Sequence, residues 1–157
     1  MKTPTILVAL LVITAVWLTP NQADAATAMQ LNDTTVLFTL NFGFTAAGDD
    51  YQLPIMASST VGYFDRVDVL GYALTGADVM VTNAVLLSNQ PVVGERYTID
   101  ADEQASFTLL IIATLSGPLT SDLTASFTKI PYWVGERRTT VHENQLNELE
   151  TVTLQAS

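Results

Sequence analysis

The sequence predicts an all-β protein: a single antiparallel β-sandwich that follows a signal peptide. Three observations lead to this prediction. An apolar leader opens the chain, period-two alternation of apolar and polar residues recurs after it, and turn residues separate the alternating segments. Helix-like composition occurs only at Glu143–Leu149, which is long enough for one or two turns.

Residues 1–25 have the pattern of a secretory signal peptide. Lys2 supplies a positive charge, and the apolar run Ile6–Leu18 follows. As a helix this run covers roughly 20 Å, which is shorter than the ~30 Å hydrocarbon core of a bilayer. The sequence Ala23-Asp24-Ala25 then places small residues where a signal peptidase requires them. We expect cleavage after Ala25; the alternative is an uncleaved membrane anchor.

The remaining chain is long enough for one domain with a sizeable core. Residues 26–33 are expected to form an N-terminal arm, and 34–157 the sandwich. The clearest strand is Thr34–Phe44, because its apolar residues all fall at even positions. Further strands are expected at Tyr51–Ala57, Gly62–Leu74, Ala77–Leu87 and Arg96–Asp100.

Ala105–Leu115 is the most apolar segment of the mature chain, and its β-branched centre predicts a strand buried on both faces. Leu123–Ile130 is expected to return as a strand, followed by an aromatic loop at Pro131–Gly135. The last strand is expected at Leu149–Leu154. About seven or eight short strands without intervening helices are typical of an antiparallel sandwich, either immunoglobulin-like or a jelly roll.

Two segments carry a resemblance to a family. Val36–Asp50 is a strand that ends in a Gly-Asp-Asp turn, and Asp102–Leu115 is an acidic turn that leads into a strand through Phe107-Thr108-Leu109. In these features the chain resembles the immunoglobulin-like modules of exported bacterial surface proteins. The resemblance implies an adhesive, spacer or surface-assembly role, and it brings no catalytic residues.

The charge of the chain excludes several classes of partner. The formal net charge is −10, and after residue 25 five basic residues face fifteen acidic ones. Such a surface repels phosphate backbones and anionic lipid headgroups, so we expect no nucleic-acid binding and no membrane binding after signal cleavage. The chain has no cysteine, which excludes thiol catalysis and thiolate metal sites.

No reactive constellation is recognisable, so the chain is predicted not to be an enzyme. His142 is the only histidine, it is expected to be exposed, and the Gly-x-Ser-x-Gly motif is absent. A small secreted hydrolase with paired carboxylates remains a third hypothesis, because a glycosidase needs only two acids at the right separation.

Acidic turns are the candidates for calcium, the one cofactor considered. Asp100, Asp102 and Glu103 are the main set, and clustered carboxylates supply the oxygens that Ca²⁺ prefers. The alternative is that these acids cap turns.

An aromatic loop is the candidate ligand-binding site. Tyr132 and Trp133 are suited to stacking on a sugar ring, and Arg137 is suited to an acidic group. The favoured alternative is that Trp133 closes one end of the core.

The leading hypothesis is therefore an exported, non-enzymatic structural or adhesive module that is secreted, extracellular or at the cell surface, with the periplasm as an alternative. We expect a protein partner or self-association. The second hypothesis is a carbohydrate- or calcium-binding extracellular module that uses Tyr132, Trp133 and the acidic turns.

Overall fold

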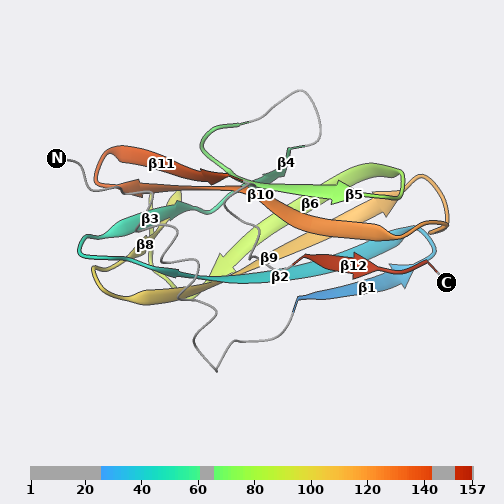
Figure 1. Cartoon of the computed structure of the whole chain (residues 1–157), viewed down its shortest axis with the longest axis horizontal. Coiled ribbons are helices and arrows are strands. Elements are labelled where there is room, and N and C mark those ends of the chain that lie inside the picture. Colours follow the sequence, from blue (N-terminus) through green and yellow to red (C-terminus); the bar gives the residue numbers. More distant parts are fainter. Residues whose placement is uncertain (1–25, 61–65, 143–150, 157) are drawn as a thin grey trace.

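The computed structural model describes residues 26–60, 66–142 and 151–156, in which two β-sheets pack face to face (Figure 1). The prediction of an all-β sandwich is confirmed. The first sheet, called sheet A here, has the strand order β1 (Thr27–Asn32), β2 (Thr35–Thr45), β9 (Gln104–Leu115) and β6 (Val79–Ser88).

The second sheet, sheet B, is built around the long strand β10 (Leu123–Val134). Two shorter groups of strands complete it. Its other members are β3 (Tyr51–Pro54), β4 (Ala57–Ser59), β5 (Leu70–Thr75), β7 (Val92–Val93), β8 (Arg96–Ile99), β11 (Arg137–His142) and β12 (Val152–Leu154).

Strand β10 has two different neighbours along each of its edges. Lys129 is paired with β5 through Gly71 and with β11 through His142, so β5 and β11 lie on opposite edges. Trp133 is paired with β11 through Arg138 and with β3, which places β3 on the same edge as β5. One edge of β10 therefore carries β5 and then β3, and the other carries β12 and then β11.

The predicted loop at Pro131–Gly135 is wrong, because β10 continues as far as Val134. A proline disfavours this assignment in a central strand, since it cannot donate to a ladder. Pro131 lies between Lys129, the last residue paired with β5, and Trp133, the first paired with β3. No strand pairs with Pro131 on that edge, so the strand tolerates its missing N–H group.

The core lies between the sheets and is filled from β2 as the alternation predicted. Its apolar side chains at even positions are all buried, namely Val36, Phe38, Leu40, Phe42 and Phe44. Sheet B contributes Tyr132, whose ring stacks on that of Tyr51 at 5.5 Å between centroids. Phe42 stacks on Phe107 at 5.0 Å and meets Phe127 edge-on at 5.2 Å. Such aromatic pairs add to the stabilisation from burial.

The first and last described strands each join one of the two sheets. Residues 27–32, within the predicted arm, form β1 and pair with β2 of the same chain. The leader 1–25 and the short helix-like segment Glu143–Leu149 lie outside the described residues. Of the predicted last strand, Val152–Leu154 is observed as β12, which pairs with β10 and lies beside β1 (Figure 1).

Candidate functional site

The outer face of sheet A is the most unusual surface of the described part of the chain, because its strands carry no charge. None of β1, β2, β9 and β6 contains an Asp, Glu, Lys, Arg or His residue. The protein nevertheless has a net charge of −10. Charges normally keep such a solvated face soluble and monomeric, so their absence requires an explanation.

Strand register assembles apolar side chains on this face into rows. Met29, Leu37 and Ile112 lie side by side across β1, β2 and β9. In the next row, Leu110 of β9 pairs with Val85 of β6. Met29 is 54% exposed, Val85 46% and Ile112 44%. Most of the remaining positions hold uncharged polar residues, with Val81 and Leu87 as further apolar ones, so the face is uncharged and partly apolar.

The prediction that Ala105–Leu115 is buried on both faces is wrong, because β9 is covered on one face only. Leu109 and Ile111 are fully buried between the sheets, whereas Ile112 and Thr114 are exposed on the outer face. The sequence showed that this strand is apolar on both sides. It did not show that within the described residues no element covers the outer side.

Sheet B has the opposite character, since the charged residues in its strands are all basic. Arg96, Lys129 and Arg138 lie on its outer face, and Arg137 is at the start of β11. Lys129 is buried and donates to the carbonyl of Arg66, and Arg138 donates to the carbonyl of Val67 at 3.4 Å. The segment that includes Arg66 therefore covers part of this face.

Trp133 lies on the outer face of sheet B and is covered. Its neighbour Tyr132 points into the core, so Trp133 points to the other side of the sheet. It is only 6% exposed, because the Arg96 guanidinium lies 3.8 Å from the centre of its ring. Arg96 is held there by a hydrogen bond to the Gln52 side chain at 3.2 Å. Trp133 thus neither presents a free stacking face nor closes the end of the inner core.

The other two residues of the predicted ligand site, Tyr132 and Arg137, do not lie beside an exposed aromatic ring. Tyr132 is fully buried, and burial raises the pKa of its hydroxyl above the ordinary 10.0, while Thr139 opposes that rise. Arg137 is exposed at the hairpin between β10 and β11. The structure therefore does not bring Tyr132, Trp133 and Arg137 together on one accessible surface.

The acidic turns hold one another in place. Asp102 has a φ of 64° and accepts a hydrogen bond from the N–H of Gly48 at 3.0 Å. Asp50 accepts one from the N–H of Ala101 at 2.9 Å. Glu103 donates from its backbone to the carbonyl of Asp100 at 3.0 Å. These are the turn-capping contacts of the alternative interpretation.

Metal-binding and membrane-spanning features are not found in the described ranges. In residues 26–60, 66–142 and 151–156, no three His, Cys, Asp or Glu side chains are grouped so as to hold a metal ion. In these same ranges, no helix has the length and apolarity needed to cross a bilayer. His142 is exposed at the end of β11, as expected.

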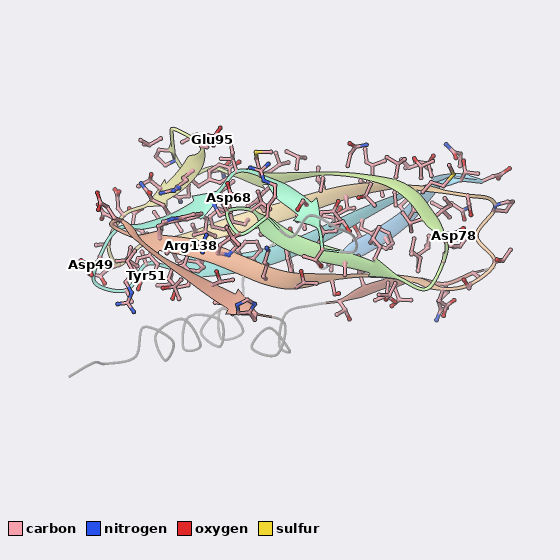
Figure 2. The ribbon with its side chains drawn as sticks, turned by 90° about the horizontal axis from the view of Figure 1, so that it is seen from above. Asp49, Tyr51, Asp68, Asp78, Glu95 and Arg138 are labelled. Carbon is pink, nitrogen blue, oxygen red and sulfur yellow. The ribbon has the colours of Figure 1, made fainter. Side chains whose placement is uncertain are left out.

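A signal for the uncharged surface was present in the sequence but was not recognised. From residue 79 to residue 94 the chain contains no charged residue, although 14% of all residues are charged. This run forms β6 and β7, and Asp78 and Glu95 flank it (Figure 2). Two further runs without charge, residues 34–48 and 104–121, contain β2 and β9, so the sequence already placed no charge in three strands of sheet A.

Comparisons with known proteins add little to this picture. No family model matches the chain, and no curated protein matches it. Among solved structures, it is similar to a crystal structure of the yeast GGA1 GAE domain. The identity is 14% and the TM-score 0.30, over 88% of this chain and 96% of that one. The assignment as a sandwich therefore rests on the pairing within the two sheets.

Proposed function

We propose that this chain is an exported, non-enzymatic structural or adhesive module that works by protein–protein contact through sheet A. The contact surface, called the uncharged surface here, comprises three parts. They are the outer face of sheet A, the edge of β6 that pairs with no described strand, and β7. The observation that carries the proposal is the absence of charge from all four strands of sheet A in a protein of net charge −10.

Electrostatics disfavours association of two copies through their acidic ends. Two acidic molecules repel each other wherever their carboxylates meet. The acidic residues of the described chain all lie outside strands, for example Asp49 near one end of the sandwich and Asp78 near the other (Figure 2). Contact through the uncharged surface keeps these carboxylates at the periphery and removes exposed apolar side chains from water.

The sugar-binding alternative loses its main support from the geometry, because Tyr132 and Trp133 are both buried. Export is supported by the leader pattern in residues 1–25. We therefore place the protein outside the cytoplasm, where self-association at a cell surface gives such a module its use.

Sedimentation velocity over a range of concentrations tests the proposal on residues 26–157. The wild-type chain is expected to associate as its concentration rises. A variant with Thr39→Lys and Val85→Lys adds two charges to the uncharged surface and is expected to remain monomeric. A matched control with Ser126→Lys and Thr140→Lys adds the same charges to the outer face of sheet B, and it should behave as the wild type. A wild-type chain that is monomeric throughout would refute self-association.

A further inference from the structure

Strand β6 leaves one of its edges open. In sheet A it is the terminal strand, paired with β9 on one side, and no other described strand is hydrogen-bonded to it. β4 of sheet B lies beside it but pairs only with β5. At ten residues, β6 contains no proline and no lysine, the two residues that commonly protect an edge from pairing with another chain.

Exposed apolar side chains are concentrated at this edge. The described residues expose eleven large apolar side chains, and six of them lie in β6 or β7: Met80, Val81, Val85, Leu87, Val92 and Val93. β7 belongs to sheet B and pairs with β8, whose Tyr97 hydroxyl donates to the carbonyl of Leu86 in β6 at 2.8 Å. An edge that is both open and apolar is a site for strand addition.

The opposite edge of sheet A is shorter and less apolar. β1 is the terminal strand there, six residues long, and β12 of sheet B lies beside it (Figure 1), as β4 lies beside β6. β1 exposes two large apolar side chains, Met29 and Leu31, whereas β6 exposes four. Pairing of like edges about a two-fold axis uses the same patch on both molecules and closes, so it stops at a dimer.

The distribution of charge indicates which partner strand fits the β6 edge and whether it runs parallel or antiparallel to β6. A second copy presents the same uncharged run, so no carboxylate enters the interface. In an antiparallel pair, Asp78 at the start of β6 lies opposite the polar end of the other strand at Asn89 and Gln90. In a parallel pair, Asp78 would lie beside its own copy and be repelled. An antiparallel C2 pair thus avoids the repulsion between the two Asp78 carboxylates that a parallel pair introduces.

We propose that β6 pairs antiparallel with β6 of a second copy, joining two four-stranded sheets into one continuous sheet. This inference rests on the proposed function and specifies its partner and its contact. The hydrogen bond of Tyr97 to Leu86 occupies one end of the open edge, so the axis passes close to Asn83 and Ala84. The side chains of Val81, Asn83, Val85 and Leu87 then continue the uncharged face across the two-fold axis.

A pair of lysine variants separates edge pairing from stacking of faces. Asn83→Lys places a charge on the outer face at β6, and Thr39→Lys places one on the same face at β2, two strands farther in. Edge pairing predicts that Asn83→Lys weakens the dimer at least tenfold while Thr39→Lys leaves it unchanged. Comparable melting temperatures of the two monomers establish that both variants fold.

Single cysteines provide an independent readout, because the chain has none of its own. Directly opposed residues of an antiparallel pair have Cα atoms about 4.5–5.5 Å apart, within the reach of a disulfide. Oxidation of Val81→Cys, Asn83→Cys and Val85→Cys should give a covalent dimer most readily at one position and less readily on either side of it. Ile112→Cys, on β9, should not cross-link.

Each outcome has one meaning. Dissociation of Asn83→Lys alone, with a maximum of cross-linking within β6, supports the proposal. Equal cross-linking at all three β6 positions indicates parallel pairing and overturns it. Dissociation of both lysine variants without cross-linking at β6 indicates stacked faces, which overturns the edge pairing but keeps the proposed function. A wild-type chain that neither associates nor cross-links refutes the edge pairing and the self-association on which it rests.

Discussion

The guanidinium of Arg96 lies 3.8 Å from the centre of the Trp133 ring and donates to the Gln52 side chain. Two side chains from β8 and β3 thus cover an aromatic residue on β10. A cation held over a tryptophan ring is attracted by the ring's electron distribution, and it also excludes water from that face. At the scale of single residues, this contact explains why the predicted aromatic platform is closed.

Arg96→Ala tests this explanation. Removal of the guanidinium should expose the Trp133 ring, so its fluorescence emission should shift to the red and become more accessible to acrylamide. The free energy of unfolding should fall by about 1 kcal/mol, the usual size of a partly desolvated cation–π contact. Residues 26–157 contain no other tryptophan, which makes the emission specific to this site.

Arg137→Ala is the control for Arg96→Ala. It removes the same group from an exposed position in the hairpin between β10 and β11, and it should leave the emission unchanged. Emission from Arg96→Ala that matches the wild type would show that Trp133 is covered by something other than Arg96.

At the scale of elements, alternation was enough to predict the strands of the core but not what lies outside it. In β2, five even-numbered apolar residues predicted one buried face, and all five are buried. In β9, apolar residues on both sides suggested two buried faces, and Ile112 proved to be exposed. Periodicity identifies which residues share a face, whereas burial depends on which elements pack there.

Strand β10 illustrates the same limit for the candidate site. Pro131 predicted an interruption, because proline cannot donate to a ladder. The strand passes through this position, since β5 ends before Pro131 and β3 begins after it. Tyr132 and Trp133 therefore lie on opposite sides of a sheet and not together on a loop. Their separation is a consequence of tertiary pairing, which no local pattern in the sequence encodes.

The connection between β5 and β6 depends on Gly76. Its φ of +115° is rarely adopted by other residues, and a Cβ atom there would collide with the backbone carbonyl of Asp122, just before β10. Gly76→Ala should therefore lower the free energy of unfolding by about 2–4 kcal/mol, through backbone strain and steric overlap together. Urea-induced unfolding measures the loss.

Gly94→Ala is the matched control for Gly76→Ala. Gly94 also has a positive φ, of 65°, but a Cβ atom there would meet nothing. Only the backbone strain applies, so the expected loss is about 1 kcal/mol. An equal decrease in the free energy of unfolding for the two variants would show that the close approach of Asp122 does not contribute to the cost of Gly76→Ala.

At the scale of the whole molecule, charge is segregated by position in the fold. Within the described residues, acidic side chains lie outside the strands, strand charges are basic and confined to sheet B, and sheet A carries none. This distribution allows two modes of association with opposite electrostatics. Two uncharged surfaces meet despite a net repulsion, or an acidic end of one molecule meets the basic face of another through attraction.

The sign of the salt dependence distinguishes these modes. Salt screens the repulsion between two molecules of net charge −10, and an uncharged interface contains no ion pair for it to weaken. The dissociation constant of the β6-paired dimer should therefore fall several-fold between about 0.02 M and 0.5 M sodium chloride, a range over which the Debye length shrinks from roughly 20 Å to 4 Å. Sedimentation equilibrium measures it.

Sodium chloride is the appropriate salt, because sulfate strengthens apolar association by itself. Asn83→Lys serves as the control: it should remain dissociated at every salt concentration if the weakened contact, and not the long-range field, limits its pairing. A wild-type dissociation constant that rises with salt would instead favour an acidic end docked on Arg138 and its basic neighbours. In that arrangement attraction between unlike charges holds the molecules together, and screening weakens it.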